Sequence, residues 1–360
     1  MIQIKIEETS RILYIDILRI VSIFAVVVLH VSAPFAANMN TYGTRWWWIG
    51  NIADSATRWS VPVLIIISGR LLLDNSREED VFPFLKKRFT KVIIPLIFWS
   101  FVYMLRDSKS AIQLDALLFK QFLLNLYTAK VHIHLWYLYM IVGLYLITPI
   151  IRIYVKNAKK ESIFYFIVIW FISNGIIGFS EKFMSYNIGF NLSFFNWSLG
   201  YYILGFLFER YNPSGNQRKI IYILGFLGLS ITIYGTFLLT LDNAGELVPH
   251  LYSYFAPNVI FMSISVYLLF KNIDWNKTIA KIPVVNNLIS SLGKTSFGIY
   301  LIHLLVLDII SSGDIGIIVK VSSFNPIIGI PLVSILTYFI SFLVVFIVQR
   351  IPLLNRVVPK

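Results

Sequence analysis

The stretch Arg19–His30, "RIVSIFAVVVLH", is an apolar run with an ionisable residue at each end. The apolar character continues beyond both ends, over about residues 12–33. Such a run is typical of a transmembrane helix, because roughly 20 apolar residues cross the hydrocarbon core of a bilayer. A charge in that core costs at least about 2.5–3.5 kcal/mol, so an arginine and a histidine there are candidates for function.

The rest of the chain has the same membrane character. Of its 360 residues, 57% are hydrophobic and only 14% are charged, with a mean hydropathy of +0.74. Soluble domains carry about 25% charged residues. We therefore expect an all-α polytopic membrane protein with ten transmembrane helices, formed as one domain over residues 1–360 without a soluble domain. The expected spans are about 12–33, 46–73, 83–105, 134–155, 162–180, 190–209, 219–241, 250–271, 290–312 and 326–349.

The basic residues are distributed unevenly between the loops. Although the net charge is +13, twenty Lys and Arg residues fall in one alternating set of loops and seven in the other. This is the positive-inside pattern, and it predicts that both termini are cytoplasmic. It explains the positive charge without a nucleic-acid partner. The longest outer loop contains an apolar stretch, residues 116–127, that predicts a short amphipathic helix at the interface.

The spacing of Arg19 and His30 places them on one face of the first helix. Eleven residues at 100° each amount to three turns plus about 20°, and the axial separation is about 16 Å. Asp16 lies three residues before Arg19 and can pair with it. Two interpretations stand here: a pair of interfacial anchors, or a polar track that leads from the cytoplasm to a histidine near the outer side. Histidine suits general-base catalysis, since its ordinary pKa is about 6.5.

Three other places carry polar residues within the expected spans. Arg58 lies mid-span with Asp54 four residues before it, so a structural ion pair is favoured over direct chemistry. His134 and Trp136 begin the fourth span, where an interfacial anchor and a substrate site are alternatives. His303 lies centrally in the ninth span, as a helix–helix hydrogen-bonding group or as part of a site.

Cysteine is absent, which excludes disulfides, thiolate metal sites and a cysteine acyl-enzyme. No metal is predicted.

Five blocks of sequence carry these residues. They are "YIDILRIVSIFAVVVLH" (14–30), "RWSVPVLIIISGRLLL" (58–73), "FLKKRFTKVIIPLIFW" (84–99), "HLWYLYMIVGLYLITPII" (134–151) and "TSFGIYLIHLLVL" (295–307). In this order they resemble the acyltransferase-3 family of integral membrane O-acyltransferases, whose first helix carries an arginine, ten residues and a histidine. One departure is that the basic pair reads Arg88-Phe-Thr-Lys91 rather than two arginines.

The resemblance implies an acyl-CoA donor, commonly acetyl-CoA, which enters from the cytoplasm. It implies a glycan or lipid-linked glycan acceptor and a multi-pass protein of the plasma membrane. His30 would be catalytic, and Arg19 with the pair Arg88 and Lys91 would bind the donor. Lys87 belongs to the same basic cluster at the inner mouth, which would hold phosphates or would simply be positive-inside charge.

The expected chemistry starts with a neutral His30, which takes the proton of an acceptor hydroxyl as that oxygen attacks the thioester. Arg58 or the indole of Trp136 would stabilise the oxyanion, and His134, Trp136 and His303 would contact substrate. An acyl-histidine intermediate is the variant of this mechanism. A transporter or lipid-linked glycan flippase is the alternative function, because buried charges occur there too. A non-enzymatic anchoring protein is a third. The acceptor, the acyl group and a homo-oligomeric state are open.

Overall fold

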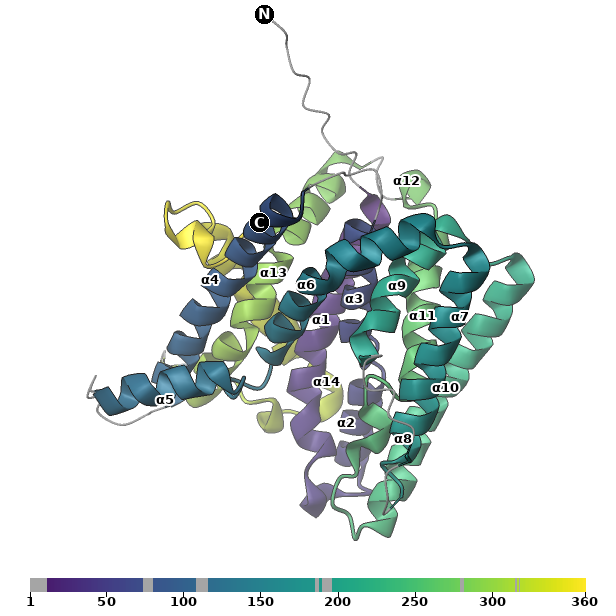
Figure 1. The fold of residues 1–360 in the computed structure, drawn as a ribbon. Coiled ribbons are helices and arrows are strands. Elements are labelled where there is room, and N and C mark those ends of the chain that lie inside the picture. Colours follow the sequence, from purple (N-terminus) through teal and green to yellow (C-terminus); the bar gives the residue numbers. More distant parts are fainter. Residues whose placement is uncertain are drawn as a thin grey trace, which may run out of the picture.

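The protein is described by a computed structural model over residues 12–73, 80–107, 116–184, 188–189, 196–278, 282–314, 316 and 318–360. The described residues form helices and no strands, which confirms the all-α prediction (Figure 1). Eight helical segments among them are long and apolar enough to cross a membrane. These are Leu13–Ala36 (α1), Val81–Asp107 (α4), Trp136–Asn157 (α6), Lys160–Ser180 (α7 with η2 and α8), Gly215–Asp242 (α10), Pro249–Asn272 (η3 with α11), Pro283–Ser312 (α13) and Pro326–Val348 (α14).

The shorter elements complete the chain. They are η1 (Met39–Thr41), α2 (Arg45–Ser55), α3 (Ser60–Leu72), α5 (Ala116–Tyr127), α9 (Trp197–Arg210), α12 (Trp275–Thr278), η4 (Val321–Ser323) and η5 (Leu354–Arg356). The fifth expected span, 162–180, divides into α7 (Lys160–Trp170), the π-helix η2 (Phe171–Ile177) and α8 (Gly178–Ser180). The eighth divides into η3 (Pro249–Tyr252) and α11 (Pro257–Asn272), so the helix restarts at the proline that interrupts the apolar run.

Two of the expected spans differ from the helices in the structure. The stretch 46–73 is not one helix but two, α2 and α3, with the break at residues 56–59. Pro62 explains the break, because it has no N–H and its ring collides with the carbonyl four residues earlier. Expected span 190–209 is described only from residue 196, and its helix α9 has 14 residues. In Figure 1, α2 and α3 follow one another along the same side of α1.

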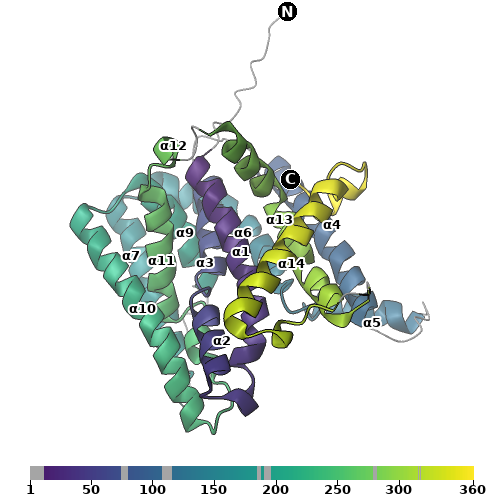
Figure 2. The ribbon, with the colours of Figure 1, turned by 180° about the vertical axis from the view of Figure 1, so that it is seen from behind.

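Helices α1 and α13 form the centre of the bundle. Their most apolar windows are 61% and 56% buried, against 22% for α10 and 17% for the α7 segment. Seen from behind, α13 and α14 lie on one side of α1 and α10 and α11 on the other (Figure 2). Most positions on α1 and α13 are therefore in contact with other helices rather than with lipid.

Helices α3 and α9 cross at two glycines. A Cβ built on Gly69 would lie 1.7 Å from the carbonyl oxygen of Tyr202, and one on Gly205 would lie 2.0 Å from that of Ile66. Neither position leaves room for a side chain, so the two backbones are in direct contact. Arg70, next to Gly69, pairs with Glu209 of α9 at 2.8 Å and ties the same crossing at its polar end.

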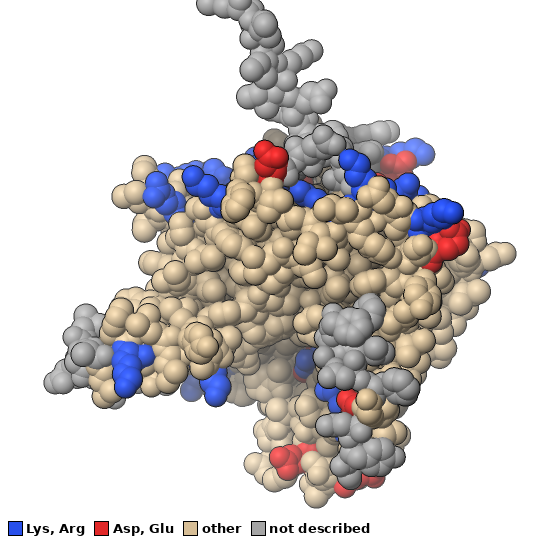
Figure 3. Space-filling view, in the orientation of Figure 1, with Lys and Arg blue, Asp and Glu red and all other residues tan. Residues whose placement is uncertain are grey.

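The two ends of the bundle differ in charge. Lys and Arg gather along the upper end in Figure 3, where α1, α4, α10 and α13 begin. At the opposite end, α5 stands apart from the bundle, and its Leu117, Phe119 and Tyr127 are exposed, as expected of an interfacial helix. The predicted loop residues Lys5, Arg11, Arg77, Lys109 and Lys281 lie outside the described residues.

Candidate active site

Arg19 and His30 each line a cavity inside the bundle, at different levels of α1. Arg19 lines an inner cavity of about 150 Å³ on the side of the basic end. His30 lines an outer cavity of about 600 Å³ on the opposite side. Both cavities are lined by residues of α1, α4 and α13, so they lie one above the other along the same three helices.

The inner cavity is narrow and mostly apolar. Its polar lining consists of the Arg19 guanidinium, two serine hydroxyls and the hydroxyls of three tyrosines. Those residues are Ser68, Ser296, Tyr137, Tyr145 and Tyr300. Arg19 pairs with Asp16, with Nη1 and Oδ1 3.6 Å apart, as the sequence predicts. The separation is long for a salt bridge, so the guanidinium keeps donors for another anion.

Arg88 approaches the same region from α4. Tyr145, which lines the inner cavity, lies within electrostatic range of both Arg88 and Arg19. The Nε of Arg88 is buried and has no hydrogen-bond partner among the described residues. The other basic residues of this segment, Lys87 and Lys91, are exposed. Lys91 donates a hydrogen bond of 3.1 Å to the carbonyl of Lys360.

The outer cavity has a polar rim. Arg106 of α4 pairs with Asp308 of α13 and with Asp314, each at 2.5 Å. Asp107 also lines the cavity. Figure 3 shows that the molecule is hollowed at this end, between the α5 arm and the far ends of the helices on the opposite side. The outer cavity therefore offers an entry for a polar molecule on the face opposite the basic end.

Four histidines form a chain beside the outer cavity, and the two ends of the chain, His30 and His132, line that cavity. The ring centroids are 5.3 Å apart for His30 and His303, 5.2 Å for His303 and His134, and 5.0 Å for His134 and His132. Tyr103 stacks on His132 at 4.0 Å. His303 and His134 are completely or almost completely buried, at 0% and 2% exposure. His30 is partly exposed to the outer cavity.

Hydrogen bonds define which ring nitrogens carry protons. Nδ1 of His303 lies 2.7 Å from the Tyr300 carbonyl, which only accepts, so Nδ1 is the donor. In the neutral ring Nε2 is then an acceptor, and it has no partner among the described residues. By the same logic, Nε2 of His134 donates to the Leu301 carbonyl at 3.3 Å. His132 then donates from Nδ1 to Nδ1 of His134 at 2.9 Å.

His132 lies in the loop before α6 and is the histidine of the chain furthest from His303. Its pKa is lowered by burial, while the carboxylates of Asp107 and Asp308 partly oppose that shift. His132 therefore keeps a neutral ring at neutral pH.

Arg58 is a buried member of an ion pair. Its guanidinium lies 2.6 Å from Oδ2 of Asp54, and its Cζ lies 4.0 Å over the Tyr252 ring. The predicted pairing with Asp54 is therefore confirmed. The positive charge also lies within electrostatic range of His30. Arg58 is thus held in place by Asp54 and Tyr252, and its positive charge contributes to the electrostatic potential at His30.

Trp136 belongs to an aromatic cluster instead of lining either cavity. Its ring centroid lies 5.9 Å from that of Trp197 and 5.8 Å from that of Tyr254, and those two rings stack on each other. The cluster joins the start of α6 to the start of α9.

Among the predicted site residues, the structure brings His30, His134 and His303 together at one level and Arg19 and Arg88 at another. His132 and Tyr300 were missed by the sequence argument. The His-X-His spacing of 132 and 134 was a usable signal, because a short loop keeps such residues close. Tyr300 lies one helical turn before His303 and therefore shares its face. Among the described residues, no group of three or more His, Asp or Glu side chains is arranged to hold a metal ion.

The fold and the cavities define an integral membrane protein with a polar site buried between its helices. The family model described as "Acyltransferase domain", of the acyltransferase-3 family, matches residues 12–346, and the chain belongs to that family. The match covers every residue of the two cavities and of the histidine chain. No curated protein and no solved structure matches the chain significantly.

Proposed function

We propose that this membrane acyltransferase moves an acyl group, acetyl by preference, from cytoplasmic acyl-CoA to a hydroxyl of a cell-surface glycan or lipid-linked glycan. The observation that carries the proposal is the pair of cavities at two levels of the same helices, with buried His303 in ring contact both with His30 of the outer cavity and with Tyr300 of the inner cavity. A donor from one side and an acceptor from the other would meet at His30. The basic end of the bundle would face the cytoplasm of a cell with this protein in its plasma membrane, with α2–α3 and α9 as two further crossings.

The donor would enter at the basic end. Its phosphates would be held by Arg88 and Arg19, helped by the exposed amines of Lys87 and Lys91. The inner cavity suits the thin arm of coenzyme A, because it is narrow and its walls are largely apolar. Between that cavity and His30 lie the buried rings of His134, Tyr300 and His303, and the thioester has to pass this layer to react.

The proposed reaction is the attack of an acceptor hydroxyl on the thioester of the donor. The acceptor O–H loses its proton to His30 while its oxygen bonds to the thioester carbonyl carbon. The C–S bond then breaks, the acyl group stays on the acceptor, and the CoA thiolate takes the proton from His30. A transient acyl-histidine at His30 is the two-step variant of the same transfer.

Two neighbours would prepare His30 for this role. The unpartnered Nε2 of His303 is an acceptor on the adjacent ring, suited to hold the N–H of His30 so that the other nitrogen serves as the base. Arg58 would stabilise the developing oxyanion through its charge, since Asp54 and Tyr252 hold it in place. His134 and Trp136 would act through packing around the path of the substrate.

The test uses inside-out membrane vesicles that contain the wild-type chain or His30→Ala, supplied with acetyl-CoA labelled in the acetyl group. We expect label on a membrane glycan only with the wild type. Mass spectrometry of surface glycans from cells with and without the gene identifies the acceptor. Label that stays on the donor in wild-type vesicles, with unchanged surface glycans, would overturn the proposal and would favour a transport function.

A further inference from the structure

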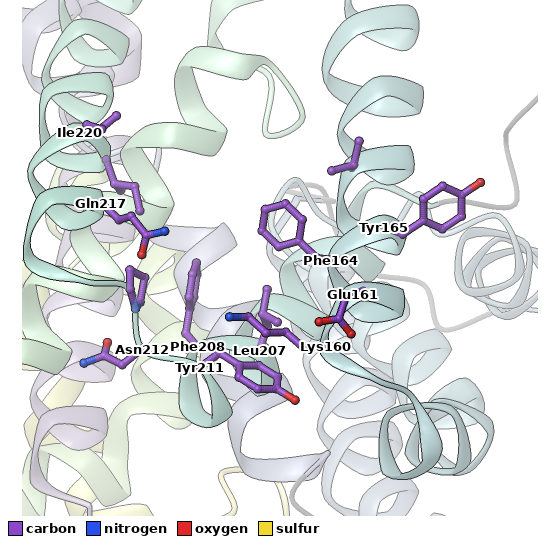
Figure 4. A pocket seen from close by; sticks show the side chains of 13 residues that line it. Lys160, Glu161, Phe164, Tyr165, Leu207, Phe208, Tyr211, Asn212, Gln217 and Ile220 are labelled. Atoms are coloured by element: carbon purple, nitrogen blue, oxygen red, sulfur yellow. The ribbon is translucent and has the colours of Figure 1, made fainter.

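A second large cavity lies far from the histidine chain, on the outer surface of the bundle. It is a groove of about 820 Å³ between α7, the end of α9 and the start of α10 (Figure 4). The walls are almost entirely apolar, and several of them are exposed side chains that the family match and the acyl transfer do not explain. These are Phe164, Tyr165, Val168 and Ile220. Two of the helices that form the groove, α7 and α10, belong to the least buried candidate spans, so the groove opens toward lipid between them.

One end of the groove is basic. Lys160 lies 5.2 Å over the Tyr211 ring, and Arg210 lies 5.7 Å from the same ring. Figure 4 shows the Lys160 side chain reaching toward Leu207 and Phe208, while Tyr165 points away from the groove. Glu161 is the acidic residue of the lining. Lys159 and Arg218 lie next to this rim in the chain, which leaves an excess of positive charge.

The start of α7 is a second feature of this end. No side chain caps α7, whose N-cap residue is Lys159. The start of α10, on the other side of the groove, carries a complete capping box from Ser214 and Gln217. The first N–H groups of α7 therefore lack the side-chain partner that those of α10 have, and they lie beside Lys160 and Glu161 of the first turn. Uncapped helix N-termini bind phosphate groups well.

We infer that this groove is a binding site for one anionic phospholipid. Its phosphate would lie at the start of α7 against Lys160 and Arg210, and one acyl chain would lie along Phe164, Val168 and Ile220. The combination of an apolar groove that opens to the bilayer with a basic rim at one end matches the two parts of such a lipid. The inference does not depend on the acyl-transfer chemistry.

The test is native mass spectrometry of the purified full chain in the presence of equal amounts of phosphatidylglycerol and phosphatidylcholine. We expect one retained lipid with a preference for phosphatidylglycerol. Lys160→Gln should lower that preference about fivefold, the equivalent of ~1 kcal/mol for one basic residue near the headgroup. Lys182→Gln removes the same charge at the other end of the bundle and should leave the preference unchanged.

A groove-filling variant tests the acyl-chain part. Val168→Trp places an indole in the groove and should abolish retention of both lipids, while Ile231→Trp, on a lipid-facing surface of α10 outside the groove, should retain them. If Val168→Trp fails to fold, Ile220→Trp fills the groove from the α10 side. Equal retention of both headgroups by the wild type, equal behaviour of the two tryptophan variants, or a dimer in which a second copy covers the groove would each overturn the inference.

Discussion

The two ends of α1 carry polar residues, and the surroundings of these residues differ. At the basic end, Arg19 lines a narrow cavity and shares its region with Arg88 and a carboxylate partner. At the other end, His30 lines a cavity four times as large, and its nearest ring neighbour is another imidazole. In the proposed mechanism, the first end would hold the charge of the donor and the second end would transfer a proton. One apolar helix supports both residues because α2, α3, α13 and α14 pack around it.

The largest effect should come from the histidine end. His30→Ala should lower kcat for acyl transfer by about 10²–10⁴-fold, the range for loss of a general base, with little change in folding. Transfer of labelled acetyl in vesicles measures it. His250→Ala is the matched control, since His250 packs on Phe183 away from both cavities and should keep full activity. An active His30→Ala enzyme would remove the functional contrast between the two ends.

The charge-holding end should respond in binding rather than in turnover. Arg88→Gln should raise KM for acyl-CoA by about 10- to 100-fold, because a hydrogen bond to a charged group contributes about 1.5–3 kcal/mol. The value of kcat should change little. Lys91→Gln should give a smaller rise, since that amine is exposed and hydrogen-bonded to Lys360. A fall in kcat at unchanged KM would assign Arg88 to the reaction itself.

The glycine crossing should affect both ends through the scaffold. Gly205→Val adds a side chain whose Cβ would lie only 2.0 Å from the Ile66 carbonyl oxygen of α3. Residues of α3 also line the inner cavity. We expect a loss of about 1–3 kcal/mol of stability, or more if the helices cannot separate. Thermal unfolding of the purified protein measures it. Gly143→Ala has open space around its Cβ and should leave the melting temperature unchanged or raise it.

The smallest effect concerns pH. The lowered pKa of His132 means that the unfolded chain binds a proton below about pH 6.5 that the folded chain does not. The stability should therefore fall as the pH drops from 6.5 toward the folded pKa, and it should be constant above that range. His132→Asn should flatten this part of the profile of Tm against pH. An identical profile for variant and wild type would show that the shift has no energetic weight.

Much of this architecture follows from the sequence alone, because a helix that crosses a membrane needs a long run of apolar residues, and such runs are visible in the sequence. The runs at α1, α4, α6, α10, α13 and α14 were each found within a few residues at one end or the other. The break between α2 and α3 was missed although the polar stretch at 51–60 and Pro62 were visible, because Asp54 and Arg58 were interpreted as an ion pair within one continuous span. The loop helix α5 was predicted correctly from its apolar stretch, and the pairs Asp16–Arg19 and Asp54–Arg58 from helical spacing.

The site was only partly accessible to the same reasoning. Spacing within one helix placed Arg19 and His30 on a common face, but no rule of spacing connects His303 of α13 to the loop histidines 132 and 134. Their meeting depends on how α13 packs against α1 and α4, which is a tertiary property. For the same reason Tyr300 and the outer carboxylates could not be selected from other polar residues.

The three helices that line both cavities have a thermodynamic consequence. If each cavity holds one substrate as proposed, a shift of α1, α4 or α13 that admits one substrate would also reshape the cavity for the other. Their affinities are then linked, and linkage between two binding equilibria is reciprocal. If a saturating acceptor tightens the hold on coenzyme A by some factor, coenzyme A must tighten the hold on the acceptor by that same factor, and titrations run in both orders should return one number.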